Sequence, residues 1–210
     1  MSENNAKIGS KKNKNGCGFK ITIAGIIIAV ILTLLVICIV KFFDYTSEQY
    51  KKISFPIKYS QIVEEMSEKY DVDQDLIYSV IKTESNFDAE AKSAVGALGL
   101  MQIMPTTFEW LQSYHDGVIT MDKEELFVPE ISIEYGTIFL KYLIDRYSEK
   151  SIDCVIAGYN AGAGAVDEWL ADTKYSKDGI TLDYIPYPET ENYVEKVLIA
   201  MGEYEQILKE

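Results

Sequence analysis

The hydrophobic pattern of the chain opens with an uninterrupted apolar run at residues 21–40. The run reads ITIAGIIIAVILTLLVICIV and contains no charged residue. As a helix it would extend about 30 Å, which is the thickness of the hydrocarbon core of a bilayer. It exceeds the apolar region of about 7–15 residues that is typical of a signal peptide, and no A-x-A-like cleavage site follows it. The pattern therefore predicts a single, uncleaved transmembrane helix.

Beyond residue 59 the apolar positions recur with the period of amphipathic α-helices. Residues 41–58 mix charged and aromatic side chains without a sustained period, which indicates a juxtamembrane stalk. Because proline suits the first turn of a helix, three prolines mark helix starts. The predicted helices lie at 60–70, 74–85, 105–111, 130–148, 151–160 and 163–171, with a last helix beginning at Pro188. No alternating strand pattern competes, apart from a short extended piece at 179–186, so the domain at 59–210 is predicted to be all-α.

The strongest apolar stripe falls on the predicted helix at 130–148. Its members occupy positions i, i+3, i+4, i+7 and i+8, and are Tyr135, Ile138, Phe139, Tyr142 and Leu143. Residues at this spacing share one face of a helix. We therefore expect all five side chains to be buried.

One carboxylate interrupts the apolar face of the predicted helix at 74–85. Glu84 lies seven, four and three residues after Ile77, Val80 and Ile81, so it continues their face. A glutamate at a helix end often bends out to water, and periodicity alone favours that interpretation. If the carboxyl is instead half-buried, desolvation raises its pKa, as a general acid near neutral pH requires. Such a group could protonate a glycosidic oxygen.

The charge distribution separates the first twenty residues from the rest of the chain. The 210 residues carry a formal net charge of -13, of which residues 1–20 contribute +4 and the remainder -17. Because lysines before the apolar run outweigh Lys41 after it, the positive-inside rule places 1–20 in the cytoplasm as a basic tail and residues 41–210 outside. A body this acidic would repel phosphate backbones, which argues against nucleic-acid binding.

Cysteine and histidine are sparse in the predicted exported part. Cys154 is the only cysteine after the apolar run, so no intramolecular disulfide can form there, and we expect a small residue packed between helices. His115 is the only histidine, which argues against a zinc site and against a Ser-His-Asp or Cys-His hydrolase. We expect no metal and no cofactor.

Two later segments also place polar residues beside glycines or at helix ends. The loop SAVGALG at 93–99 leads into LMQIMP, and its glycines permit backbone geometries that other residues resist. The segment AGYNAGAG at 157–164 places Tyr159 and Asn160 at the end of an apolar helix, just before a glycine break. Each feature alone is more often structural. Together with Glu84 they predict polar groups that converge on one cleft.

These segments resemble, in order, the motifs of the soluble lytic transglycosylase catalytic domain. The matching stretches are ESNF (84–87), SAVGALGLMQIMP (93–105), AGYNAG (157–162) and PETENYV (188–194). The resemblance covers roughly residues 56–207. It implies a lysozyme-like, all-α fold and cleavage of the β-1,4 bond between N-acetylmuramic acid and N-acetylglucosamine in peptidoglycan. The expected partners are therefore glycan strands and, through residues 21–40, the cytoplasmic membrane.

The resemblance also implies roles for individual residues. Glu84 matches the single catalytic acid and base of the family. Substrate-binding positions are matched by Ser93, Met101, Gln102, Tyr159, Asn160, Glu189 and Tyr193, and structural support by Ser85, Gly96 and Gly99. One departure is Ser132, which occupies a position where asparagine is frequent.

The mechanism that the resemblance implies needs only one carboxyl group. Ordinary glycosidases use two, about 5–5.5 Å apart when retaining and about 6.5–9.5 Å when inverting, and no acidic partner lies within the motifs around Glu84. Glu84 would protonate the departing oxygen and then take a proton from the muramic acid 6-hydroxyl, which closes onto the anomeric carbon. The alternatives are a hydrolytic muramidase of the goose-lysozyme type, and a glycan-binding component of a wall-crossing machine such as a secretion, conjugation or spore-forming complex.

Overall fold

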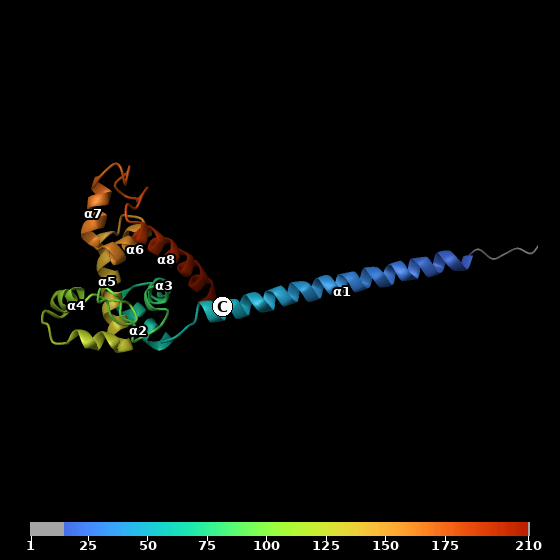
Figure 1. Ribbon diagram of the computed structural model, residues 1–210, viewed down its shortest axis with the longest axis horizontal. Helices are drawn as coiled ribbons and strands as arrows, with labels where there is room; N and C mark the ends of the chain where they lie inside the picture. The colour runs from blue at the N-terminus through green and yellow to red at the C-terminus, as the bar shows by residue number, and fades with distance from the viewer. Residues whose placement is uncertain (1–14, 210) are drawn as a thin grey trace, which may run out of the picture. The chain divides into compact units, whose positions relative to one another are not determined.

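The structure, a computed structural model, describes residues 15–209 of the chain. The chain forms two compact units, Met1–Lys51 and Lys52–Glu210. Within the described residues, the first unit is part of one helix, α1 (Asn15–Ser54; Figure 1). Residues 1–14 of the basic tail predicted at 1–20 lie outside the described residues.

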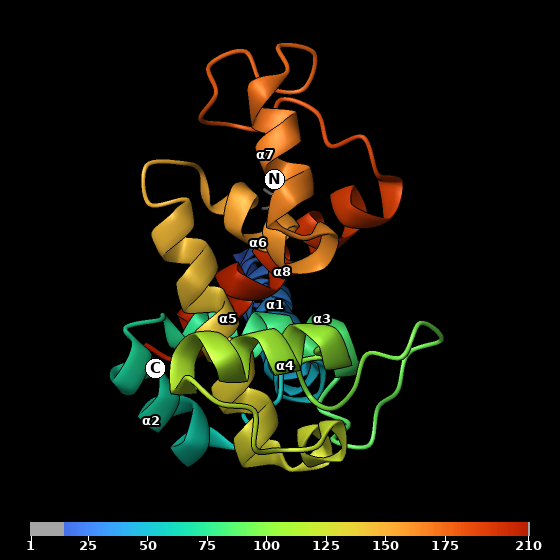
Figure 2. The same cartoon turned by 90° about the vertical axis from the view of Figure 1, so that its left-hand side faces the viewer.

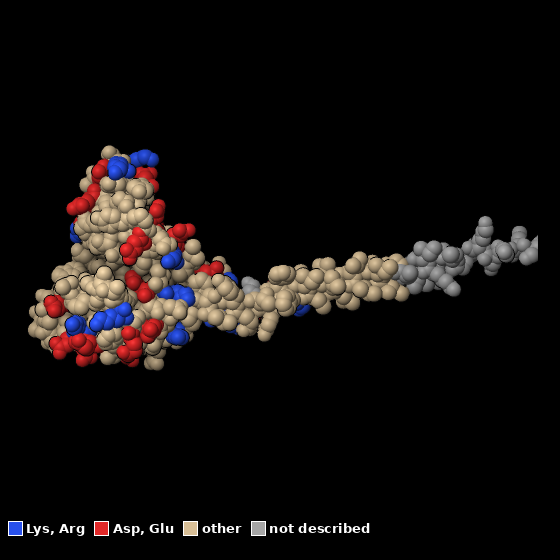
Figure 3. Space-filling model, in the orientation of Figure 1, with Lys and Arg blue, Asp and Glu red and all other residues tan. Residues whose placement is uncertain are grey.

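Helix α1 is long and apolar enough over Gly25–Ser54 to cross a membrane. None of its most apolar stretch is buried inside the structure, and Ile26, Ile31 and Leu35 are each more than half exposed. Uncharged surface runs along most of its described length in Figure 3. A helix that is apolar all round and covers no protein core suits hydrocarbon. The helix also continues through most of the predicted stalk to Ser54.

The second unit is all-α in the part of the chain that the structure describes, as predicted. Its helices are α2 (Ser60–Tyr70), α3 (Gln74–Ser85), α4 (Pro105–Leu111), α5 (Pro129–Arg146), α6 (Ile152–Ala161), α7 (Ala163–Ala171) and α8 (Pro188–Ile207). A π-helical turn, η1 (Gln112–Asp116), extends α4, and a 3-10 turn, η2 (Lys123–Phe127), precedes α5. Between α3 and α4 the backbone forms only isolated β-bridges.

The core fixes the position of the last turn of α3. Helix α3 packs mainly against α8, and α6 packs against α5, α7 and α8; Figure 2 shows α3 and α4 with α8 behind them. Ile77, Val80 and Ile81 of α3 are fully buried, and the rings of Tyr78 and Tyr204 stack with centroids 5.1 Å apart. Because one face of α3 is locked into this core, the residues at its C-terminal end have a defined position.

The stripe predicted on α5 is only partly buried. Tyr135, Ile138 and Leu143 belong to the core, as expected. Phe139 and Tyr142 are half-buried and pack at its edge, which corrects the prediction. Periodicity identifies the face of α5 that meets neighbouring helices, but it does not show at which residue of α5 the contact with those helices ends.

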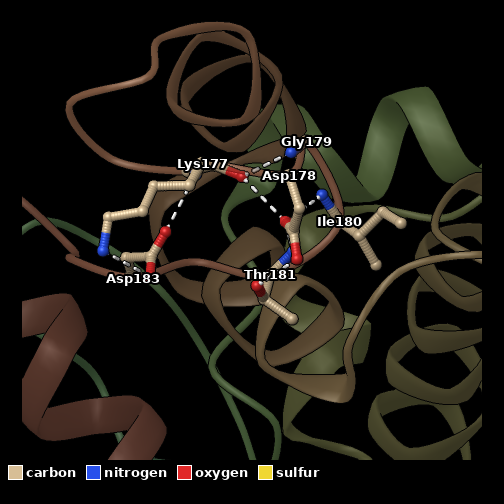
Figure 4. Close-up of polar contacts among 7 residues, drawn as sticks. Lys177, Asp178, Gly179, Ile180, Thr181 and Asp183 are labelled. Carbon is tan, nitrogen blue, oxygen red and sulfur yellow. Dashed lines mark hydrogen bonds and ion pairs between the residues drawn. The ribbon is translucent and has the colours of Figure 1, made fainter.

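No strand forms at 179–186, and the segment begins instead with a tight turn at Asp178–Thr181 (Figure 4). The Asp178 carboxylate accepts hydrogen bonds from the backbone N–H groups of Ile180 at 2.7 Å and Thr181 at 2.8 Å, and from the Thr181 hydroxyl at 2.9 Å. These bonds lower the pKa of Asp178 to about 2. A side chain that satisfies the backbone donors of its neighbours favours a turn over a strand.

Candidate active site

A cleft of about 240 Å³ lies at the C-terminal end of α3. Its lining comes from α3, the loop between α3 and α4, and helices α4, α5, α6 and α8. Six of the residues that the sequence singled out line it together: Glu84, Ser93, Gln102, Tyr159, Asn160 and Glu189. The fold thus brings together side chains that are spread over about half of the chain.

Glu84 occupies the last turn of α3, where the chain reverses direction. Asn86 and Phe87 take left-handed backbone conformations, with φ of 52° and 64°, and so end the helix. The Ser85 hydroxyl lies 2.8 Å from the Leu100 carbonyl oxygen and 3.1 Å from that of Ile81. Ser85 therefore ties the end of α3 to the loop that forms one wall of the cleft.

Burial raises the pKa of the Glu84 carboxyl from 4.5 to about 7. The cause is desolvation, which disfavours the charged form. The buried hydroxyl of Tyr193 approaches the carboxyl without forming a well-shaped hydrogen bond, and this contact offsets part of the rise. A substantial fraction of Glu84 is therefore protonated at neutral pH.

Two buried tyrosines lie close to Glu84. The Tyr159 hydroxyl donates a hydrogen bond of 2.9 Å to the Met101 carbonyl oxygen. Burial and the nearby Glu84 charge raise the pKa of both Tyr159 and Tyr193 well above the usual value. Both hydroxyls therefore stay neutral, and because the hydrogen of Tyr159 is used by Met101, Tyr193 is the one left as a donor beside the carboxyl. Tyr193 does not belong to the cleft lining but lies buried behind it.

Met101 supports the cleft wall and does not line it, which corrects the role expected for its side chain. It is fully buried, and its side chain fills the space beside Gly136, where any Cβ atom would collide with it. Its backbone N–H donates to the Ser132 hydroxyl oxygen at 3.2 Å, and its carbonyl accepts from Tyr159. Ser132, at the position where asparagine is frequent, thus anchors the same loop.

The loop between α3 and α4 depends on unusual backbone conformations. Gly99 has φ of 76°, and a Cβ atom there would collide with the Leu126 carbonyl. Gln102 also has a left-handed φ, 48°, and its side-chain amide donates to the carbonyl oxygens of Ala91 at 3.0 Å and Gly99 at 2.8 Å. Because both amide hydrogens are used within the loop, the Gln102 amide oxygen is the group left for a ligand.

The remaining polar lining residues offer donors and a second carboxylate. The Ser93 hydroxyl oxygen accepts from the Ala97 N–H at 2.9 Å, which leaves its hydrogen free. Thr190 donates to the Asn160 amide oxygen at 2.8 Å, so the Asn160 N–H groups point elsewhere. Glu189 is exposed in the first turn of α8. Among the described residues, no group of three or more His, Cys, Asp or Glu side chains is arranged to hold a metal ion.

Six further lining residues were not predicted to belong to a cleft. They are Val95, Ala97, Ile103, Met104, Thr107 and Phe139. Four are apolar residues of the 93–105 segment, whose signal in the sequence lies in its polar and glycine positions, and Thr107 follows on α4. The sixth, Phe139, belongs to the periodic apolar stripe of α5 and was therefore predicted to be a core residue. Apolar side chains in a cleft and in a core have the same helical spacing, so periodicity cannot separate them.

The chain is similar to known proteins over most of its length. It is 30% identical over 169 residues to the soluble lytic murein transglycosylase of Salmonella typhimurium, covering 80% of this chain and 25% of that protein. It is also 30% identical over 169 residues to membrane-bound lytic murein transglycosylase C of Glaesserella parasuis, covering 71% of this chain and 46% of that protein. The chain thus spans about a quarter of the first of these relatives and about half of the second.

A solved structure shares the fold. It is an inactive glutamate-to-glutamine mutant of the lytic transglycosylase Slt from Pseudomonas aeruginosa. The two chains superpose with a TM-score of 0.65 and 29% identity, over 75% of this chain and 25% of that one. The model of the transglycosylase SLT domain matches residues 61–181, more than half of the chain and most of the cleft lining. The chain therefore belongs to the transglycosylase SLT domain family.

Proposed function

We propose that this protein is a membrane-anchored lytic transglycosylase that cleaves the β-1,4 bond between N-acetylmuramic acid and N-acetylglucosamine in peptidoglycan. The observation that carries the proposal is the Glu84 carboxyl, which lines the cleft. Burial raises the pKa of this carboxyl to about 7. Relatives named lytic murein transglycosylases support the substrate class. An inactive glutamate-to-glutamine mutant of the Pseudomonas aeruginosa enzyme indicates that such chemistry depends on a glutamate in that protein.

In the proposed reaction Glu84 acts first as acid and then as base. The protonated carboxyl gives its proton to the glycosidic oxygen as the bond from that oxygen to the anomeric carbon breaks. The Glu84 carboxylate then takes the proton of the muramic acid 6-hydroxyl, and that oxygen bonds to the anomeric carbon. The product carries a 1,6-anhydro ring, Glu84 is protonated again, and no water is consumed. The neutral hydroxyl of Tyr193 supports the carboxylate between the two steps.

The environment of Glu189 bears on the choice between this mechanism and a hydrolytic one. A hydrolytic muramidase that works with two carboxylates would use Glu189 as the partner of Glu84, since both line the cleft. The two groups differ in environment, because Glu84 is held at the end of a buried stripe whereas Glu189 is exposed at the rim. We therefore assign Glu189 to substrate binding and not to the proton transfers.

The test compares two matched substitutions in the full-length chain, Glu84→Gln and Glu189→Gln. The rate of muropeptide release from purified peptidoglycan is expected to fall by about 10²–10⁴-fold for Glu84→Gln, the usual contribution of general acid–base catalysis. For Glu189→Gln we expect a loss of about tenfold, as for one lost ligand contact. Equal, large losses for both variants would favour the two-carboxylate mechanism, and full activity of Glu84→Gln would overturn the proposal altogether.

The anchoring part of the proposal rests on α1 and on the lysines that precede it. The helix has the length and composition of a membrane span, and a membrane-bound relative supports such an attachment. With the N-terminus in the cytoplasm, the domain after residue 51 faces the wall. Protease added to intact spheroplasts should digest that domain. Digestion only after the membrane has been ruptured would show the opposite orientation.

A further inference from the structure

Four aromatic side chains form a connected cluster that reaches the surface beside the cleft. This aromatic platform consists of Trp110, Tyr114, Phe139 and Tyr142. The Trp110 and Tyr114 rings stack at 5.4 Å with an interplanar angle of 23°, and Tyr142 lies edge-on to both, at 4.8 Å from Trp110 and 5.6 Å from Tyr114. Trp110 is 39% exposed and Tyr114 59%. Large aromatic groups gathered at a surface commonly mark a binding site.

The platform continues the wall of the cleft. Thr107 on α4 and Phe139 on α5 line the cleft, and the Phe139 ring lies 5.0 Å from that of Tyr159. Three residues further along each helix, and therefore on the same face, come Trp110 and Tyr142. Helices α4 and α5 are in contact, and Figure 2 shows α4 across the front of the domain. An aromatic surface thus leads from the wall of the cleft outwards along two adjacent helices.

The backbone beneath the platform is held firmly. Tyr114 lies in the π-helical turn η1, next to the fully buried side chain of Gln112. The Gln112 amide oxygen accepts from the N–H groups of Thr120 at 2.9 Å and Met121 at 2.8 Å, and its amide nitrogen donates to the Met121 carbonyl at 3.1 Å. Single π-helical turns are often found at functional sites. A surface fixed in this way loses little conformational entropy on binding.

The chemistry of the platform fits a sugar. Its rings are uncharged, and each of Trp110 and Tyr114 joins an apolar face to a polar edge. Neither the Trp110 indole N–H nor the Tyr114 hydroxyl has a hydrogen-bond partner in the described structure, so both edges are available to a ligand. A pyranose ring likewise has apolar C–H faces and a rim of hydroxyl groups. Sugar faces can stack on the rings while the hydroxyls bond to the ring edges.

We propose that the aromatic platform binds saccharide units of the glycan strand beyond those held next to Glu84. This inference rests on the proposed function, because it extends the same cleft along the same polymer. It assigns Trp110 and Tyr114 to substrate binding. The number of sugar units that the enzyme binds then depends on these two side chains.

The experiment measures the affinity of the full-length chain, in detergent, for N-acetylglucosamine oligomers of increasing length. Glu84→Gln serves as the parent so that no turnover occurs, and binding is followed by calorimetry. Affinity should rise with oligomer length, and adding Trp110→Ala or Tyr114→Ala should remove roughly tenfold of the affinity for long oligomers while leaving short ones unchanged. The chain has two tryptophans, and Trp169 is 4% exposed, so a fluorescence change that occurs only with long oligomers reports Trp110.

Tyr184→Ala is the matched control. Tyr184 is 49% exposed and stacks on Tyr175 at 6.2 Å with an interplanar angle of 23°, which is close to the arrangement of Tyr114 on Trp110. It lies in the segment between α7 and α8 and does not line the cleft. The Tyr184→Ala variant should keep the length dependence of the parent.

Several outcomes separate this inference from the proposed function. An unchanged length dependence in Tyr114→Ala overturns the inference, and this variant decides the matter if Trp110→Ala fails to fold. If the wild type still releases anhydro-muropeptides, the proposed function stands without the platform. Conversely, a loss confined to long oligomers in a chain whose wild type shows no lytic activity supports the platform and overturns the enzymatic function.

Discussion

Replacing Glu84 with glutamine should stabilise the domain above neutral pH although it removes the catalytic acid and base. Glutamine has nearly the same shape as glutamate but carries no charge to desolvate. Because burial raises the folded-state pKa, the folded protein binds a proton more tightly than the unfolded chain between about pH 4.5 and 7. The free energy of unfolding of the wild type therefore falls as pH rises through this window. The difference between 4.5 and about 7 corresponds to about 3 kcal/mol, which the substitution should recover.

The assay is thermal unfolding of the full-length chain in detergent, followed by near-ultraviolet circular dichroism. At about 2–4 °C per kcal/mol, Glu84→Gln should raise the midpoint by about 6–12 °C at about pH 9, and by almost nothing at about pH 4. Glu65→Gln removes an exposed carboxylate on α2 and should show no such dependence on pH. A Glu84→Gln variant that is no more stable than wild type at about pH 9 would mean that the carboxyl is solvated, and the argument from burial would be refuted.

Three further predictions concern catalysis and the loop that forms the cleft wall. The kcat/KM of the wild type for peptidoglycan should fall as pH rises through about 7, because the first step needs protonated Glu84; a rate that is flat from about pH 6 to 9 would contradict this. Gly99→Ala should lower the free energy of unfolding by more than about 3 kcal/mol, because its Cβ would collide with backbone atoms. Gly96 has φ of 97° but open space around it, so Gly96→Ala should lower the free energy of unfolding by about 1 kcal/mol. Denaturant unfolding measures both changes. Tyr159→Phe leaves the buried Met101 carbonyl without its donor and should cost about 1–3 kcal/mol in the same assay; an unchanged stability would show that water replaces the hydroxyl.

The helices of this domain could be predicted because their signals are local. Helix α3 forms at the predicted residues, 74–85, and α4 begins at Pro105 as expected. The apolar stripe ending at Glu84 was visible in the sequence, and the structure buries it fully. Local period and proline position suffice where each helix has one apolar face and short connections. The turn around Asp178 was missed because a side chain supplies its hydrogen bonds, and hydropathy does not record that.

The site could be predicted only in part, because its depth depends on tertiary packing. Periodicity placed Glu84 on the buried face but could not decide how deeply its carboxyl is buried, because that depends on residues packed around it from other helices, such as Tyr193. Met101 was expected in the cleft, yet the absence of a side chain at Gly136 lets it pack inward. Such a pairing between residues far apart in sequence leaves no local trace.

The central claim is that Glu84 transfers protons within the substrate and that water takes no part. The most direct test is digestion of purified peptidoglycan by the wild type in water labelled with heavy oxygen, with mass analysis of the released muropeptides. We predict 1,6-anhydro ends that are lighter by one water than hydrolytic products and contain no heavy oxygen. Reducing ends that carry the label would show that water is the nucleophile, and would contradict the account.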